Sequence, residues 1–327
     1  MQLHRSSGRG QDVKPLGKII AAVALALVAT ALPHVSAQAQ EKTVRIGFQK
    51  YGKLVLLKSK GSLEGKLQPL GYKVVWTEFP AGPQLLEAMN VGAIDFGNTG
   101  EAPPIFAQAA GAPLVYVAHE PPAPRGEAIL VPKDSPIKTV ADLKGKKVAL
   151  NKGSNVHYLL VKALEKAGVK YSEIEPIFLA PADARAAFER GSIAAWAIWD
   201  PFQAAAEAAT GARTLADGTG IVANHQFYLA TKTFTDNPKI LDVVLSELST
   251  VDGWAKSDMK AVAAQLSPSI GIPEPILEVA LERQSYGIKP LDEKVVTEQQ
   301  SIADTFYALG LLPKTIKISD VVRKAGS

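Results

Sequence analysis

Short β-branched runs alternate with helical patterns along most of the chain, and this alternation limits the folds that the chain can adopt. Strands that alternate with helices are typical of α/β proteins, in which helices cover a largely parallel sheet. We therefore expect an α/β fold. The predicted strands lie at residues 43–48, 73–79, 94–97, 114–118, 147–150, 177–179 and 195–198.

The two halves of this pattern repeat each other weakly. A shift of 99 residues lays Gly92-Ala93-Ile94 on Gly191-Ser192-Ile193, and Ala88 on Ala187. Either a duplication or the general self-similarity of α/β chains accounts for so short a match. Between the halves, Pro121-Pro122-Ala123-Pro124 predicts a stiff connector. Because the roughly 288 residues after residue 39 exceed one usual hydrophobic core, we expect two lobes.

The last third of the chain is mostly helical in its pattern. One more apolar run, at 226–230, precedes apolar residues at near 3.6-residue spacing from residue 240 onward. We expect packed helix faces here. The residues assigned to these faces are Trp254, Val279, Leu281, Ile302, Phe306, Tyr307 and Leu309.

The first 39 residues have the order of a secretory signal. Basic residues precede an apolar run from Ile19 to Leu32, and Ala37-Gln38-Ala39 fits the small-residue cleavage pattern. The run is shorter than the roughly 20 apolar residues that span a bilayer, which disfavours a membrane anchor. We expect export to the periplasm, with cleavage after Ala39 or Ala37.

The net charge changes once this segment is removed. The whole chain has 36 basic and 32 acidic side chains, a net charge of +4. The first 39 residues hold four of the basic side chains and one acidic one, so 32 and 31 remain. No basic tail or stripe is left to indicate nucleic-acid binding.

The residue types present give little support to catalysis. The chain has no cysteine, which excludes disulfides, thiol nucleophiles, thiolate metal sites and a lipid-modified N-terminal cysteine. His119, His157 and His225 remain after the signal, and no pair has metal-ligand spacing. No nucleophile elbow, H-E-x-x-H motif or P-loop occurs. We therefore expect no metal and no cofactor.

Turns after predicted strands offer sites for a small anion. Helix N-termini present free N–H groups and partial positive charge, which suit sulfonate, phosphate or carboxylate. Such turns occur at Gln49-Lys50-Tyr51-Gly52, at Lys152-Gly153-Ser154-Asn155 and at Asn98-Thr99-Gly100. These are carboxyl-end positions, where open α/β sheets bind ligands. Ordinary helix capping uses the same residue types and stays an open alternative.

The same turns belong to segments by which the chain resembles the aliphatic sulfonate-binding proteins of ABC importers. The resemblance covers residues from about 44 to 313, and its A-D-L-K-G motif is common among binding proteins. The two most specific segments are Glu78-Phe79-Pro80-Ala81-Gly82-Pro83-Gln84 and Ala195-Trp196-Ala197-Ile198-Trp199-Asp200-Pro201. The others are Phe48-Gln49-Lys50, Thr99-Gly100, and residues 103–109, 135–145 and 181–188.

The resemblance implies a type II periplasmic binding protein fold, with two α/β lobes joined by two crossing strands. One lobe would comprise residues 41–124 and 222–327, and the other residues 125–221. The ligand would lie in the cleft between the lobes, and the closed form would be recognised by the inner-membrane permease. We expect a monomer that captures a sulfonate for sulfur acquisition.

The resemblance also implies which residues line the cleft. Side chains or N–H groups of four residues would hold the sulfonate, and Trp199 would pack on its organic part unless it belongs to the core. Asp183 either lines the cleft or caps its helix. Glu101 and Glu120 would repel a sulfonate if they face the cleft. The expected ligand-binding residues are Gln49, Thr99, Gly100, Gly153, Ser154, Asn155, Asp183 and Trp199.

Two alternatives remain at this point. The same fold serves taurine and other small organic anions, and taurine is the nearest alternative ligand. The fold also has members that resemble desulfinating enzymes, which depend on cysteine or on a cysteine and histidine cluster. Because this chain has no cysteine, we expect a binding protein and no enzyme.

Overall fold

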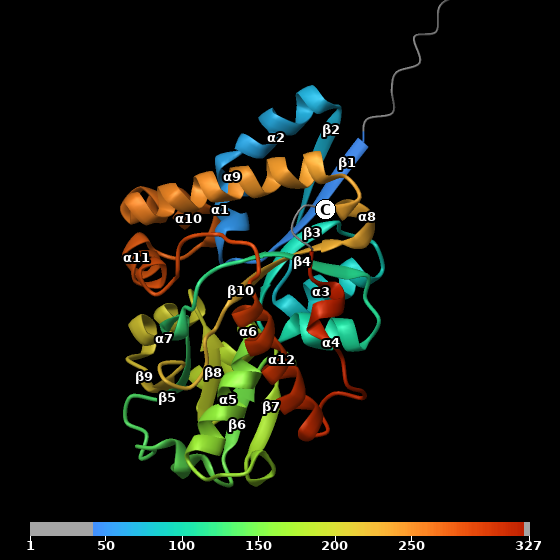
Figure 1. The fold of residues 1–327 in the computed structure, drawn as a ribbon. Coiled ribbons are helices and arrows are strands. Elements are labelled where there is room, and N and C mark those ends of the chain that lie inside the picture. Colours follow the sequence, from blue (N-terminus) through green and yellow to red (C-terminus); the bar gives the residue numbers. More distant parts are fainter. Residues whose placement is uncertain (1–41, 324–327) are drawn as a thin grey trace, which may run out of the picture. The chain divides into compact units, whose positions relative to one another are not determined.

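The computed structural model describes residues 42–323, which belong to one compact unit (Figure 1). The predicted signal at residues 1–39 and its cleavage site lie outside the described residues. Within residues 42–323, no helix combines the length and the hydrophobicity that crossing a bilayer requires.

The first sheet is mixed and has five strands. β1 pairs in parallel with β2 and β3, whereas β10 pairs antiparallel with β3 and β4. In order across the sheet, the strands are β2 (Tyr72–Glu78), β1 (Lys42–Phe48), β3 (Phe96–Gly100), β10 (Gln226–Thr231) and β4 (Leu114–His119). The strands predicted at 43–48, 73–79 and 114–118 are confirmed, as is the apolar run at 226–230. The strand predicted at 94–97 begins two residues later, at Phe96.

The second sheet has the same arrangement. β6 pairs in parallel with β7 and β8, and β5 pairs antiparallel with β8 and β9. In order, the strands are β7 (Glu175–Phe178), β6 (Lys147–Leu150), β8 (Ala195–Trp199), β5 (Glu127–Val131) and β9 (Arg213–Asp217). The shift of 99 residues carries β3 onto β8, so the weak repeat in the sequence coincides with equivalent elements.

The chain passes between the sheets twice, from β4 to β5 and from β9 to β10. The sequence analysis did not predict β5 and β9. β5 directly follows the proline-rich connector, and β9 is a short edge strand with a charged residue at each end, so neither shows the alternation of a half-buried strand.

Helices cover the sheets in two groups (Figure 1). One core joins the first sheet to α1, α2, α9, α10 and α11, and the other runs from α3, α4 and α12 into the second sheet. Their bounds are α1 (Lys53–Lys60), α2 (Ser62–Leu67), α3 (Gly82–Asn90), α4 (Pro103–Ala109), α5 (Asn155–Lys166), α6 (Pro181–Glu189), α7 (Phe202–Thr210), α8 (Lys232–Thr235), α9 (Pro238–Ser257), α10 (Met259–Ile270), α11 (Glu274–Glu282) and α12 (Glu293–Ala308).

The packed faces predicted for the last third are confirmed in part. Leu281, Ile302 and Phe306 are buried. The assignment was wrong for Val279, Tyr307 and Leu309, whose exposed fractions are 39%, 47% and 44%. Tyr307 and Leu309 lie at the end of α12, where the helix turns toward solvent.

A buried lysine links the first helix to the segment that crosses toward the second sheet. The Lys53 ammonium lies 2.9 Å from Glu120 Oε2 and 3.6 Å from Asp252 Oδ1. It also donates to the Ser285 carbonyl, and Glu120 accepts a second hydrogen bond from Tyr228 Oη. Because all these groups are buried, each charge depends on the others for compensation.

Replacing Lys53 with methionine should therefore destabilise the protein by about 3–5 kcal/mol, because it leaves Glu120 and Asp252 buried without their cation. Urea unfolding of the variant measures the loss. Lys66→Met, at an exposed position, is the control and should unfold like the wild type. A Lys53→Met variant as stable as this control would contradict the assignment.

Candidate functional site

The carboxyl ends of parallel strands from both sheets meet around a small enclosed cavity. Its volume is about 10 Å³, which is room for about one water molecule. Its lining residues are Gln49, Tyr51, Gly82, Gly100, Pro103, Gly126, Asn155, Trp199, Asn224 and Gln226. The structure thus brings together four of the eight predicted site residues: Gln49, Gly100, Asn155 and Trp199.

The Asn155 side chain connects the first turn of α5 to two other segments at this cavity. Its amide donates to Glu127 Oε2 at the start of β5 and to Asn224 Oδ1 at 3.2 Å. Asn224 in turn donates to the Ala123 carbonyl at 2.9 Å. The first turn of α5 is therefore tied to both segments that cross between the sheets.

Close approach of the two sheets depends on a glycine at residue 100. A β-carbon on Gly100 would lie only 2.8 Å from Asn155 Cγ, so any larger residue would push α5 away. On the other wall, Gln49 Nε2 donates to the Asn98 carbonyl at 3.0 Å. The Asn98 amide is itself buried, and neither of its polar atoms has a partner in the described residues.

The other four predicted site residues do not line the cavity: they are Thr99, Gly153, Ser154 and Asp183. Thr99 is buried in β3, and its hydroxyl donates to the Gly100 carbonyl. The Ser154 hydroxyl donates to the Asn151 carbonyl at 2.7 Å. The backbone N–H of Gly153 donates to His157 Nδ1 at 3.3 Å. Asp183 is exposed in the first turn of α6, outside the cavity lining.

Two buried carboxyl groups lie next to the cavity lining: Glu101 follows Gly100 in the chain, and Glu127 accepts a hydrogen bond from Asn155. Burial raises the pKa of Glu101 to about 7, although its Oε2 accepts from the backbone N–H of His225. Burial and the nearby Glu101 raise the pKa of Glu127 as well. Burial, with Glu120 as the leading charge, holds the pKa of the Tyr51 hydroxyl well above its usual range. Burial thus favours the neutral form of Glu101 and Glu127, which presents less charge to an anion than ionised carboxylates would.

Several residues of the cavity lining were not predicted from the sequence, among them Tyr51, Asn224 and Gln226. Tyr51 stands in the turn already singled out, two residues after Gln49. Asn224 and Gln226 belong to the second crossing segment, and only the topology shows that this segment passes the cavity.

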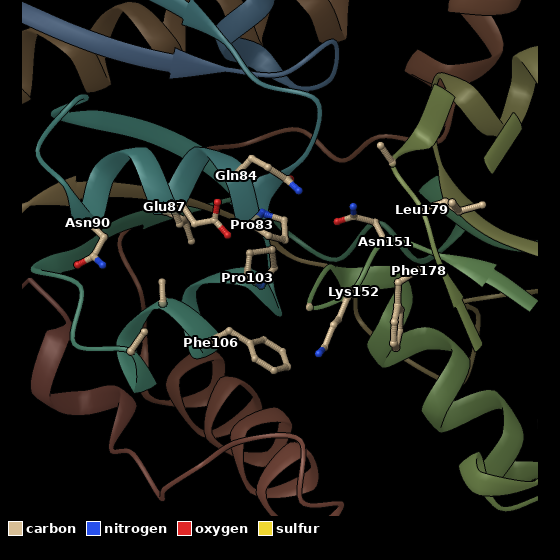
Figure 2. Close-up of a pocket in the computed structure, with 15 residues that line it drawn as sticks. Pro83, Gln84, Glu87, Asn90, Pro103, Phe106, Asn151, Lys152, Phe178 and Leu179 are labelled. Atoms are coloured by element: carbon tan, nitrogen blue, oxygen red, sulfur yellow. The ribbon is translucent and has the colours of Figure 1, made fainter. Parts of the chain in front are cut away.

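A larger pocket of about 510 Å³ opens beside the cavity (Figure 2). Its walls come from α3 and α4 on one side and from the segments after β6 and β7 on the other. Figure 2 shows Gln84 and Asn151 directed toward each other across it, and their buried amide oxygens have no partner in the described residues. Pro103 lines both the cavity and this pocket.

The described residues offer groups for binding and no arrangement for metal chemistry. Within residues 42–323, no cluster of three or more histidine, aspartate or glutamate side chains could hold a metal ion. The amides of Gln49 and Asn224 each keep a second N–H that can donate to an anion, and Trp199 supplies an apolar surface. Both N–H groups of Asn155 already donate to Glu127 and Asn224.

Comparison with known proteins shows relatives that span nearly the whole described chain. A relative from Escherichia coli (strain K12), described as an aliphatic sulfonates-binding protein, is 49% identical over 87% of this chain and 89% of that protein. The structure of the alkanesulfonate-binding protein from Xanthomonas axonopodis pv. citri bound to MOPS is 42% identical, with a TM-score of 0.82 over 86% of this chain and 98% of that chain.

Two further structures share the fold of this chain. The periplasmic aliphatic sulphonate binding protein from Escherichia coli is 48% identical, with a TM-score of 0.78 over 86% of this chain and 97% of that chain. A desulfurization enzyme is 14% identical, with a TM-score of 0.63 over 87% of this chain and 97% of that chain, which shows a shared fold alone. The predicted type II periplasmic binding protein fold is thus confirmed.

The family model described as NMT1/THI5 like matches residues 74–254, which is more than half of the chain. Together with the near-complete match at 49% identity, this assigns the family. The chain belongs to the aliphatic sulfonate-binding proteins of the NMT1/THI5-like family.

Proposed function

We propose that this protein is an exported periplasmic binding protein that captures aliphatic sulfonates and delivers them to an ABC-type importer. The observation that carries the proposal is the 49% identity to an aliphatic sulfonates-binding protein across 87% of the chain. The cavity at the carboxyl ends of the parallel strands supports it, since α/β proteins bind small ligands at such edges.

The proposed binding step uses two lobes, residues 41–124 with 222–327 and residues 125–221. A sulfonate group is larger than the 10 Å³ cavity, so the contact between Gly100 and Asn155 must loosen to admit it. Closing the lobes again would remove the ligand from water and present a surface that the permease recognises. The lobes move as rigid bodies because only two segments connect their sheets.

We propose that the sulfonate oxygens take hydrogen bonds from amides and hydroxyls at this edge. Gln49 and Asn155 line the cavity, and the buried Thr99 and Ser154 precede the lining residues Gly100 and Asn155 in the chain. Trp199 would pack on the first carbons of the ligand, while Gly100 and Gly153 leave space for its approach. The Asp183 carboxylate, exposed in the first turn of α6, would repel a sulfonate, so its proposed role is to stabilise that helix terminus.

Binding without turnover is the expected activity. The near-complete relatives at 42–49% identity are described as binding proteins, and the likeness to a desulfurization enzyme stands at 14% identity. Taurine or another small organic anion is the alternative ligand. We propose a monomer with no cofactor.

Calorimetry on ligand-stripped protein should give a dissociation constant of about micromolar or below, roughly −8 kcal/mol, for at least one alkanesulfonate. Taurine, sulfate and nitrate should bind more weakly, because they offer no apolar tail to Trp199. Sulfate or nitrate binding as tightly as every alkanesulfonate would overturn the ligand assignment. Release of sulfite on incubation would overturn the assignment as a binding protein.

Gln49→Ala should weaken alkanesulfonate binding by about tenfold, because it removes one amide donor from the cavity wall. Its thermal unfolding should stay close to that of the wild type. Gln68→Ala, which removes an exposed amide far from the cavity, serves as the matched control. Equal affinities of the two variants for the alkanesulfonate would show that Gln49 does not bind the ligand.

Affinity for a sulfonate should fall several-fold as the pH rises from about 6 to 8. The pKa of Glu101 is raised to about 7 by burial, so this carboxyl is neutral below that pH and charged above it. A bound anion favours the neutral form, and ionisation therefore weakens binding. Glu101→Gln should flatten the pH profile, whereas the exposed Glu189→Gln should leave it unchanged.

A further inference from the structure

The larger pocket beside the cavity has an apolar lining that the proposed capture of a sulfonate head does not use. We call it the tail groove. Its volume of about 510 Å³ lies within the range of small-molecule sites. The lining residues that matter for its chemistry are Pro83, Glu87, Pro103, Phe106, Lys152 and Phe178.

The tail groove adjoins the proposed head cavity. Pro103 lines both, and the neighbours Gly82 and Pro83 line one each. The head cavity has room for about one water molecule, so it must widen for the sulfonate group alone, and an alkyl or aryl tail needs further space. Any organic part beyond the first carbons must leave the cavity, and the tail groove is the adjoining space.

Two aromatic rings from opposite sides of the cleft form the apolar walls (Figure 2). Phe106 on α4 packs on Phe306 at 4.9 Å between ring centroids and faces the backbone of Gly153. Phe178 ends β7 and leaves 44% of its surface in water, which is a large exposure for a phenylalanine. A tail lying between these rings would bury that exposed surface.

The position of Phe178 is fixed by its neighbours. The Lys152 ammonium lies 5.4 Å from the centre of its ring, and the His157 ring meets it edge-on at 6.0 Å. These two contacts position the Phe178 ring at the wall of the groove. Charged groups at the groove, Lys152 and Glu87, are of opposite sign and are both exposed.

From this geometry we infer that Phe106 and Phe178 form a tail subsite that determines which sulfonates the protein prefers. The inference rests on the proposed function, because it assumes a sulfonate head in the cavity. The ligands favoured are sulfonates with an alkyl or aryl tail of about four carbons or more. Each methylene that enters the groove should raise the affinity about fourfold, the equivalent of about 0.8 kcal/mol.

The test is calorimetry with methanesulfonate, pentanesulfonate and octanesulfonate on the wild type and on Phe178→Ala. Wild-type affinity should rise at least about tenfold from methanesulfonate to pentanesulfonate. Phe178→Ala should lose about tenfold for octanesulfonate and keep its affinity for methanesulfonate. Phe106→Ala should behave in the same way.

Tyr307→Ala is the matched control, because it removes an aromatic ring of similar exposure, 47%, outside the tail groove. It should bind all three ligands like the wild type. Thermal unfolding of each variant shows whether the fold is retained, and Phe178→Leu should restore part of the chain-length dependence.

The outcomes separate this inference from the proposed function. If the wild type binds sulfonates with no dependence on chain length, the tail subsite is refuted and the proposed function stands. If Phe178→Ala weakens methanesulfonate and octanesulfonate equally, the subsite is refuted as well. If no sulfonate binds the wild type, the proposed function fails and the subsite fails with it.

Discussion

The chain crosses between the two sheets twice, and the strand that follows each crossing is built into the interior of the sheet that it enters. This exchange of strands holds the structure together. β5 follows β4 into the second sheet, and β10 follows β9 back into the first. Both exchanged strands lie inside their sheets, so each has hydrogen-bonded neighbours on both sides. The crossing segments are thereby fixed at both ends, and Asn155 and the buried ammonium of Lys53 can be positioned against them.

The chemistry of the cavity follows from this arrangement. Acidic residues next to the crossing segments are buried, and burial raises the pKa of Glu101 and Glu127. The chain can thus place carboxyl groups next to the cavity while burial favours their neutral form. Amide donors would then provide the attraction to an anion, in agreement with the 32 basic and 31 acidic side chains of residues 40–327, which nearly cancel.

The α/β class and most strands could be predicted from the sequence, because residues 43–48 and 195–198 show strong local patterns. The turns at Gln49 and Asn155 could also be predicted, since glycine and amide residues follow strand ends there. The edge strand β9 and the role of Asn224 could not, because each depends on contacts between segments about 85 to 100 residues apart. Phe178 has no sequence signal at all, and its role depends on the exposure of its ring.

The place of β10 also has a consequence for the order of assembly. β10 lies between β3 and β4, yet it is synthesised more than a hundred residues after them. Until it arrives, β3 and β4 have unpaired edges that face each other across a gap. Such edges can pair with other chains, and their closure over a long sequence distance is slow. The whole second sheet must therefore be made before the first can be completed. A truncated chain that ends before residue 226 would lack β10, and β3 and β4 would then have no strand between them.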